Sequence, residues 1–158
     1  MDEADVWSLI ESLYRARFRH FERVARAITG NSDSALEAVQ EGFADALRHS
    51  SQWTGRGPLE GWVWRCVVNR ARKTRTPAVV DLPLDGTHAS PDRSGASELA
   101  DRLAALPERQ RLVVFLRYFA DLEYREIGAA LGIETGTVSA TLHAAHANLR
   151  AGYEEALA

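Results

Sequence analysis

One stretch of the sequence combines aromatic, amide and cationic side chains at a spacing suited to a single nucleic-acid strand. Five basic residues and no acidic residue lie between Trp62 and Thr76. On a helix that turns about 100° per residue, one face of this stretch would carry a tryptophan, an asparagine and three cations. These residues are Trp62, Arg65, Asn69, Arg72 and Lys73, with Arg75 just beyond. Cations hold the phosphates, a ring stacks on a base and an amide contacts a base edge, so the stretch predicts single-strand binding.

The alternative is that the two tryptophans Trp62 and Trp64 belong to the core and that the arginines form a solvated face. The opposite side of the same helix, which carries Val63 and Val67, is apolar and must pack inward. Because no acidic residue interrupts the basic stretch, nucleic-acid binding is the favoured interpretation.

A second stretch, YREIGAALGIETGTVSATL from Tyr124 to Leu142, has the order of a helix-turn-helix. We expect Gly128 to let two helix backbones approach and Gly132 to take positive φ at the turn. The small core between the helices would contain five apolar residues: Ile127, Leu131, Ile133, Val138 and Leu142. The alternative is an ordinary helical hairpin.

The second helix of this unit would present few charges to DNA. Between Thr135 and Arg150, only Arg150 carries a full positive charge. The outward face predicted for the major groove contains Ser139, Ala140 and His143, which suit base edges and a thymine methyl group. The backbone N–H groups around Thr135 and Thr137 can meet a phosphate without any cation. The sequence therefore predicts a helix that can read DNA but holds it weakly.

Catalytic and metal-binding patterns are missing from the sequence. Its single cysteine, Cys66, rules out an internal disulfide and a cysteine-based zinc site. His143 and His146 lack a third ligand one turn away. We find no nucleophile elbow and no phosphate-binding loop, so we expect no enzyme activity, no cofactor and no metal.

Composition favours a folded protein outside the membrane. Hydrophobic residues make up 46% of the 158 residues, and no run of about 18 apolar residues occurs. The first residues, MDEADVWSLIESLY, lack the basic start and apolar segment of a signal peptide. The net charge of −3 is uneven, since the basic stretch near Trp62 is offset by acidic residues elsewhere. We expect a cytoplasmic protein with no membrane insertion.

The apolar periodicity predicts an all-α fold of two small helical domains joined by a flexible linker. Helices are expected at about 6–28, from a capping box at Ser34 and Glu37 onward, and at 58–74. Their apolar faces would include Leu9 and Leu36. The domains are 1–75 and 97–158, and the second ends in the helix-turn-helix. Residues 76–96 contain three of the five prolines and read as a linker with an r.m.s. span of roughly 25 Å. Docking of the two units into one packed body remains open.

The second domain is predicted to contain four helices. The first begins near Ser97 and carries Leu99 on its apolar side, and Pro107 is the expected first residue of the next. A short helix from about Glu123 to Leu131 and the helix from Thr135 onward form the helix-turn-helix.

Three motifs resemble the extracytoplasmic-function (ECF) sigma factors, the small two-domain members of the bacterial sigma-70 family. EAVQEGF at 37–43 looks like their polymerase-docking helix, and GWVWRCVVNRAR at 61–72 looks like their promoter-melting helix. LPERQRLVVFLRYFADLEYREIGAALGI at 106–133 closely follows their second domain. Together these motifs cover nearly the whole chain.

The resemblance implies an RNA polymerase sigma factor whose partners are bacterial core polymerase, promoter DNA and an anti-sigma factor. Glu37, Gln40, Glu41 and Phe43 would belong to the surface that docks on the polymerase clamp helices. The loop at 50–58 and Asn69 would engage the flipped base of the −10 element, with residues 65 to 75 on nearby phosphates. The second domain would sit on the polymerase flap and read the −35 element.

The sequence departs from the family pattern in the −35-reading helix. Relatives usually carry lysine or arginine at several positions that are neutral here: Ser139, Thr141, Ala144, His146 and Asn148. We therefore hypothesise that polymerase, and not this helix, supplies most of the DNA affinity. The competing hypothesis is a dimeric helix-turn-helix regulator that binds a palindrome without polymerase.

Overall fold

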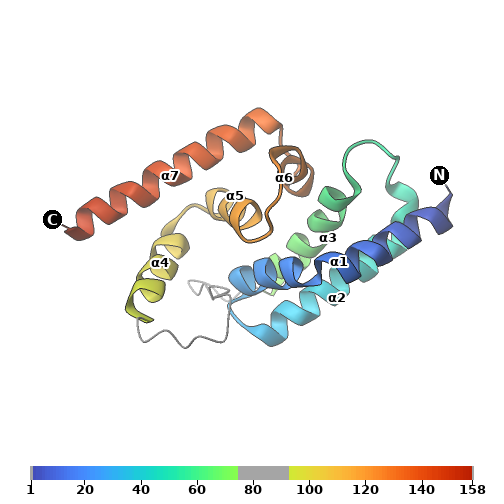
Figure 1. Ribbon diagram of the computed structural model, residues 1–158, viewed down its shortest axis with the longest axis horizontal. Helices are drawn as coiled ribbons and strands as arrows, with labels where there is room; N and C mark the ends of the chain where they lie inside the picture. Colours follow the sequence, from blue (N-terminus) through green and yellow to red (C-terminus); the bar gives the residue numbers. More distant parts are fainter. Residues whose placement is uncertain (1, 75–92, 158) are drawn as a thin grey trace.

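The structure is a computed structural model that describes residues 2–74 and 93–157, without the side chains of 93–97 and 156. Over these residues the fold is all-α, as predicted (Figure 1). The elements are α1 (Glu3–Thr29), α2 (Ser32–Arg48), the 3₁₀ turn η1 (Ser50–Gln52), α3 (Leu59–Lys73), α4 (Arg93–Ala105), α5 (Glu108–Tyr118), α6 (Tyr124–Leu131) and α7 (Thr135–Leu157). Most of the predicted linker lies outside the described residues.

Local capping explains where the first two helices begin and end. Gly30 ends α1 in the left-handed region, at φ 84°. Asn31 then caps α2, because its side-chain oxygen accepts a hydrogen bond from the Ser34 N–H at 2.8 Å. The predicted capping box at Ser34 and Glu37 is therefore wrong: Ser34 lies inside the first turn of a helix that begins at Ser32.

The first unit is a three-helix bundle of α1, α2 and α3 around a chain of aromatic rings. Trp64 is fully buried and stacks on Phe21 with ring centroids 3.9 Å apart, and Phe21 meets Phe43 edge-on at 4.8 Å. Close packing of α2 on α3 requires Gly42, where an added methyl group would lie 2.6 Å from the Val67 Cα. Aromatic burial of this kind stabilises a core by several kcal/mol per ring.

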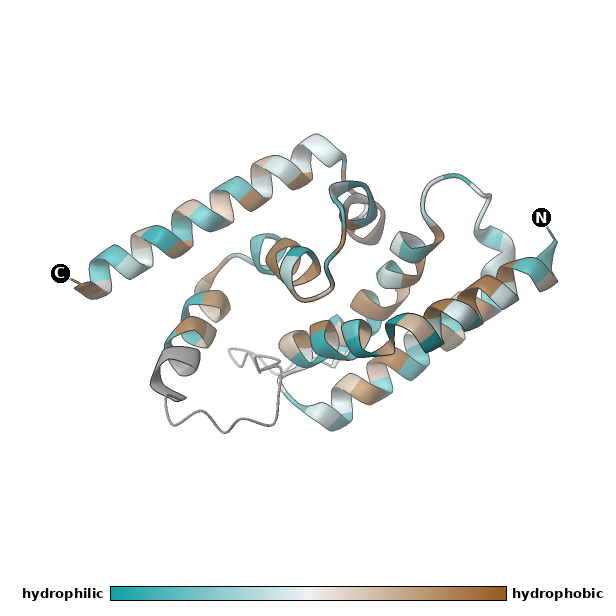
Figure 2. Cartoon of the chain, in the orientation of Figure 1, coloured by the Kyte–Doolittle hydropathy of each residue, from teal (hydrophilic) through white to brown (hydrophobic). Residues whose placement is uncertain are grey.

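The second unit places α5, α6 and α7 around one apolar core, with α4 alongside. Leu112, Val113, Ile127 and Val138 are buried in it. Hydrophobic and hydrophilic residues alternate in bands along the helices, as amphipathic helices require (Figure 2). Helix α4 begins at Arg93, four residues before the predicted start, and Pro107 precedes α5 as its cap instead of opening it.

Three leucines predicted on apolar faces are exposed instead. The exposed fractions of Leu9, Leu36 and Leu99 are 44%, 42% and 46%. In α2 the buried face consists of Val39 and Phe43 together with the small residues Ala35, Ala38, Gly42 and Ala46, which let the helices approach closely. A periodicity count weights leucine above alanine, so it turned the predicted face toward the larger side chain.

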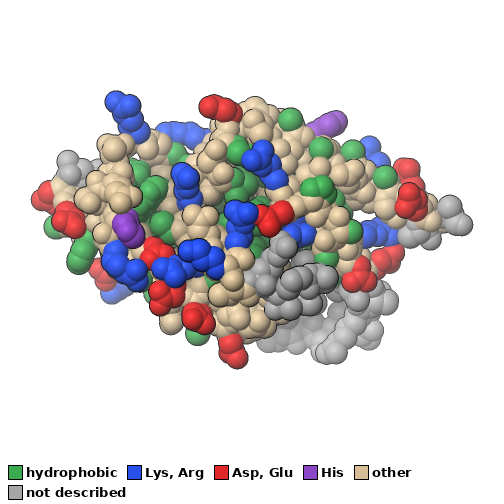
Figure 3. Space-filling view, turned by 180° about the vertical axis from the view of Figure 1, so that it is seen from behind, with side chains coloured by type: hydrophobic (Ala, Val, Ile, Leu, Met, Phe, Trp, Pro, Cys, Tyr) green, Lys and Arg blue, Asp and Glu red, His purple; other side chains and the backbone are tan. Residues whose placement is uncertain are grey.

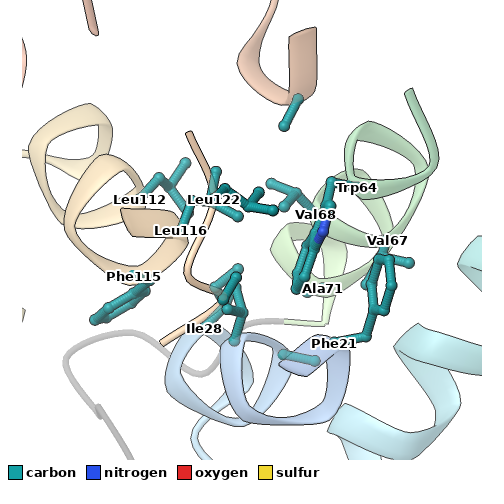
Figure 4. Close-up of a cluster of buried hydrophobic side chains, with 14 of the residues drawn as sticks. Phe21, Ile28, Trp64, Val67, Val68, Ala71, Leu112, Phe115, Leu116 and Leu122 are labelled. Atoms are coloured by element: carbon teal, nitrogen blue, oxygen red, sulfur yellow. The ribbon is translucent and has the colours of Figure 1, made fainter. Parts of the chain in front are cut away.

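The two units pack against each other. Figure 4 shows buried side chains of α1, α3, α5 and the segment after α5 meeting in one cluster, with Ile28 opposite Phe115 and Leu116. At the α3–α6 contact, a methyl group added to Gly61 would lie 2.6 Å from the Ala129 Cβ. The sequence did not decide whether the two units pack together, and in the structure they do.

The two units are also joined by polar contacts. Arg17, which Glu60 of α3 holds at 2.9 Å within the first unit, donates to the Ala120 carbonyl oxygen of the second unit at 2.5 Å, and Arg72 pairs with Glu108. Within residues 2–74 and 93–157, no helix has the length and apolar character needed to cross a membrane.

Candidate nucleic-acid interface

The outer face of α3 carries the residues that the sequence predicted for single-strand binding. Arg65, Asn69 and Lys73 are exposed, and Trp62 is half-buried beside them. Trp64, by contrast, is a core residue, as the alternative interpretation expects, and Trp62 packs against the edge of the core. Arg75 lies outside the described residues. The face therefore presents cations, an amide and part of an indole ring side by side.

One arginine of the basic stretch faces inward and is neutralised. Arg70 Nε donates to Asp45 Oδ2 at 2.5 Å, and a second guanidinium nitrogen donates to Oδ1 at 2.8 Å. The hydrogen bond from Arg70 holds the pKa of Asp45 below its usual value, and the carboxylate in turn raises the pKa of Arg70. Asp45 of α2 is therefore committed to an ion pair with α3.

The loop before α3 is held at one end and turns tightly at the other. Trp7 Nε1 donates to Ser50 Oγ at 2.9 Å, which ties η1 to the start of α1. Gly55 and Gly57 have φ values of 81° and 77°, which favour glycine. Arg56 lies between them and is exposed. This loop borders the N-terminus of α3 and therefore the face described above.

The helix-turn-helix forms as predicted, with one difference in the role of its first glycine. A methyl group at Gly128 would lie 2.6 Å from the carbonyl oxygen of Ile133, so the close approach is to the turn and not to a second helix. The Ile133 N–H donates to the Gly128 carbonyl oxygen at 2.9 Å. Gly132 takes φ 69° between them. Glycines at both positions therefore fix the angle at which α7 leaves the turn.

The predicted outward face of α7 is exposed. Ser139, Ala140 and His143 are exposed, as are Thr135 and Thr137 at the start of the helix, whereas Val138 and Leu142 are buried. Further along, His146 and Asn148 are partnered by α5, through Tyr118 at 2.7 Å and Gln110 at 2.7 Å. The face is neutral as far as Arg150.

The surface predicted to dock on polymerase is divided between exposed and buried residues. Glu37, Gln40 and Glu41 are exposed on α2, whereas Phe43 is only 5% exposed. Phe43 lines an apolar groove of about 350 Å³ between α1 and α2, together with Ile10, Tyr14, Gln40, Ala44 and Leu47. Phe43 therefore helps to form the groove, and of the three exposed residues only Gln40 lines it.

The faces of α3 and α7 open into a common cleft of about 660 Å³. Trp62 and Arg65 line it from α3, and Thr135 and Thr137 line it from α7. Figure 3 shows Lys and Arg side chains across the middle of the face that is hidden in Figure 1. In the closed arrangement, one edge of each predicted DNA-binding surface therefore lines the same cleft, whereas Asn69, Ser139 and His143 are not part of its lining.

Sequence reasoning missed three arginines of this cleft. Arg56, Arg109 and Arg125 line it and come from a loop, α5 and α6; Arg56 is more than fifty residues from the other two along the chain. No local pattern could have joined them, because only the docking of the two units brings them together. Cys66 also lies on α3, where burial raises the pKa of its thiol to about 11, consistent with a packing role.

Two family models match the chain, one in each unit. They are "Sigma-70 region 2" at residues 13–76 and "Sigma-70, region 4" at residues 102–151. The first contains the α2 surface and α3, and the second contains α5, α6 and most of α7.

Curated proteins resemble the chain over most of its length. The RNA polymerase sigma factor SigV of Bacillus subtilis is 33% identical over 136 residues, which cover 79% of each chain. The ECF RNA polymerase sigma factor SigE of Mycolicibacterium smegmatis is 30% identical, and the match covers 89% of this chain and 60% of that protein. The RNA polymerase sigma-E factor of Streptomyces avermitilis is 31% identical, with 89% and 82% covered.

A solved structure shares the fold. It is CnrH in complex with the cytosolic domain of CnrY, at a TM-score of 0.72 and 20% identity. The match covers 97% of this chain and 95% of that chain, so it extends over both units.

Proposed function

We propose which surface of this chain performs each step of transcription initiation. The chain belongs to the ECF group of the sigma-70 family. The chain is an RNA polymerase sigma factor: it directs promoter-specific initiation by binding core polymerase and promoter DNA. Sigma factors are initiation factors without enzymatic activity of their own, and polymerase carries out the catalysis. The domains proposed for these tasks are 1–75 and 97–158.

The exposed side of α2 next to the α1–α2 groove is the proposed docking surface for core polymerase. Glu37, Gln40 and Glu41 are exposed on α2, and Gln40 and Phe43 line the groove. An apolar groove with polar residues around it has the anatomy of a protein interface. The acidic residues of α2 also keep DNA away from this side of the domain by charge repulsion.

The α3 face is the proposed reader of the melted −10 element, and its composition is the observation that carries the proposal. Asn69 contacts the edge of an unpaired base, and Trp62 supplies an aromatic surface for stacking. Arg65, Arg72 and Lys73 hold the phosphates, and Arg75 continues the basic stretch. Extruding a base costs a few kcal/mol, which stacking and edge contacts offset.

The α7 face is the proposed reader of the −35 element. Ser139 and His143 hydrogen-bond base edges, Ala140 contacts a thymine methyl group, and the N–H groups near Thr135 and Thr137 meet a phosphate. With so few charges this helix binds duplex DNA weakly by itself. Tethering to polymerase raises its effective concentration at the promoter, so weak contacts suffice.

Promoter binding requires the closed arrangement to open. Elements centred about 25 base pairs apart are separated by roughly 85 Å of B-form DNA at 3.4 Å per step. The two reading faces share one cleft in this structure, so one protein molecule cannot reach both elements until α3 and α6 separate. Core polymerase holds the two domains at different places on its surface. It therefore binds the open form more tightly and shifts the equilibrium toward it.

An anti-sigma factor is the proposed regulatory partner, and the bacterial cytoplasm, where core polymerase works, is the proposed location. The CnrH structure, which was solved with the cytosolic domain of a second protein, supports a partner of this kind. A partner that binds only the closed form would hold the chain away from promoters by mass action.

Run-off transcription tests the proposed function. The purified chain is added to sigma-free bacterial core polymerase on a fragmented genomic library, and transcript starts are sequenced. We expect discrete starts that share two upstream elements and that disappear with Asn69→Ala. The matched control is Asn148→Ala, an amide substitution at a position that contacts Gln110 and not the proposed −10 strand.

Two outcomes would contradict parts of this proposal. Discrete starts that survive Asn69→Ala would remove the α3 face from −10 recognition. Polymerase-independent binding to a palindrome would support the dimeric regulator instead.

A further inference from the structure

We propose that the cleft between the two domains binds a small phosphate-rich anion, of the class of nucleoside triphosphates and inorganic polyphosphates. Four arginines line the cleft, two from each side. Arg56 and Arg65 come from the first domain, and Arg109 and Arg125 come from the second. Binding of the anion concerns the closed form of the free protein, and its effect on promoter binding rests on the proposed function.

The four cleft arginines differ from the other arginines around them. Within the described part of the chain, none of the four has a carboxylate partner, and the only acidic residue that lines the cleft is Glu134. Arg17, Arg70 and Arg72, by contrast, are all paired with acidic side chains.

Closing the domains brings these unpaired cations into one cavity. All four arginines are exposed. Like charges that line one cleft repel each other, most strongly at low salt, so the closed form gains when an anion enters. Guanidinium groups on opposite walls can each hold phosphate oxygens through paired hydrogen bonds. A compact ligand with several phosphates therefore stabilises contacts that neither domain can make alone.

Backbone and aromatic groups add to the site. Helix α7 begins at Thr135, and both Thr135 and Thr137 line the cleft, so the positive end of a 23-residue helix faces the cavity. Trp53 and Trp62 also line it and offer apolar surface to a base or ribose. A volume of about 660 Å³ suits a nucleotide and is bounded by both domains, which leaves no room for duplex DNA.

Binding at this site would oppose promoter binding. Trp62, Arg65, Thr135 and Thr137 belong both to the cleft and to the faces proposed for DNA. A ligand that binds only the closed form shifts the population away from the open form by its differential affinity. The cleft is therefore a proposed site at which a soluble polyanion restrains the free sigma factor.

Calorimetric titration of the full chain at low salt tests the site with sodium tripolyphosphate and with ATP as probes. We expect saturable binding of both at one site per chain. Equal affinities would identify the phosphate chain as the ligand and inorganic polyphosphate as a sufficient source. Tighter binding of ATP would identify a nucleotide whose base contacts Trp53 or Trp62.

Charge-matched variants distinguish binding at the cleft arginines from non-specific electrostatic attraction of the anion to the protein. Arg109→Ala with Arg125→Ala should weaken tripolyphosphate binding at least tenfold. Arg19→Ala with Arg150→Ala, which removes the same charge from exposed positions outside the cleft, should change the affinity less than twofold. Glu134→Gln should tighten binding severalfold, a gain that misfolding would not produce.

Three results would overturn the proposal. They are no saturable binding to the wild-type chain, an equal loss in the two double variants, and no gain from Glu134→Gln. The titration contains neither polymerase nor promoter, so its failure would leave the sigma-factor function in place.

Discussion

Helices α3 and α7 are the two proposed DNA-reading elements, and they use opposite means. The exposed face of α3 carries Arg65, Arg72 and Lys73 around one amide, whereas α7 presents small neutral side chains as far as Arg150. Phosphate contacts dominate affinity and base contacts dominate specificity. On the proposed function, α3 would both hold and read a melted strand, while α7 would only read a duplex that polymerase keeps in place.

Removing cations from α3 should have the largest effect on promoter use. We expect Arg65→Ala, Arg72→Ala and Lys73→Ala together to slow open-complex formation by roughly a hundredfold, because three phosphate contacts to a single strand are lost. Ser139→Ala with His143→Ala should slow it less than tenfold. The measurement is the rate of transcript formation by the reconstituted holoenzyme at several salt concentrations.

An equal fall in the rate of open-complex formation in the α3 and α7 variants would contradict the proposed difference between the two helices. It would mean that α7 contributes as much binding free energy as α3 despite its lack of charge. Binding of each variant to core polymerase, measured in parallel, is the control for misfolding.

The orientation of α7 should matter more than its charge. Gly128→Ala places a methyl group 2.6 Å from the Ile133 carbonyl oxygen and should lower the free energy of unfolding by about 2–3 kcal/mol. Gly136→Ala is the matched control, since nothing lies within 4 Å of the added methyl group and alanine favours helix. Chemical denaturation measures both, and a loss of similar size in the control would remove the turn from the explanation.

Much of this contrast could be predicted from the sequence, because it depends on local patterns. Glycine at 30, 128 and 132, the apolar core of the helix-turn-helix and the outward face of α7 all follow from residue type and helical period. The starting point of α2 was predicted wrongly because Asn31 and Ser34 are both good caps, and only the turn after Gly30 decides between them.

The cleft between the domains could not be predicted, because it depends on contacts across the linker. Arg56 and Arg125 are 69 positions apart in the sequence, and Gly61 shows its role only when Ala129 packs on it. The pairing of Asp45 with Arg70 likewise depends on tertiary packing and could not be predicted from the sequence. Patterns predict faces of single helices, and tertiary packing decides which faces meet.

Arg70 has a structural role in α3, because it pairs with Asp45, and in this it differs from the cations proposed to contact DNA. We expect Asp45→Asn to lower the free energy of unfolding at pH 7 by about 1–2 kcal/mol, because Arg70 loses a charged acceptor in a partly buried site. The pKa of Asp45 is lower in the folded chain than in the unfolded chain. Its stabilisation is therefore fully present above the unfolded pKa and is lost as the pH falls through the folded pKa.

Urea unfolding of the wild type and of Asp45→Asn between pH 2.5 and 7 measures this pH dependence. The two curves should converge at the acidic end. Glu41→Gln is the control, since Glu41 lies 3.7 Å from Arg48 with both side chains about half exposed, and it should change stability little at any pH. A constant difference across the range would exclude ionisation of Asp45 as its cause.

Adding positive charge to α7 should raise its DNA affinity, and this is the smallest of the effects expected here. Ala144→Lys with Ala147→Lys places two cations beside the proposed groove-facing residues, at positions where the helix is otherwise neutral. We expect holoenzyme affinity for a duplex −35 element to rise roughly fivefold, and its dependence on log salt to steepen by about 0.9 for each new phosphate contact. The glutamine pair at the same positions is the control for side-chain size. A steeper salt dependence confined to the lysine pair would show that α7 is weak because it lacks charge and not because it is wrongly placed. No change would mean that this face does not lie against DNA, and −35 recognition would then have to come from another surface of the second domain.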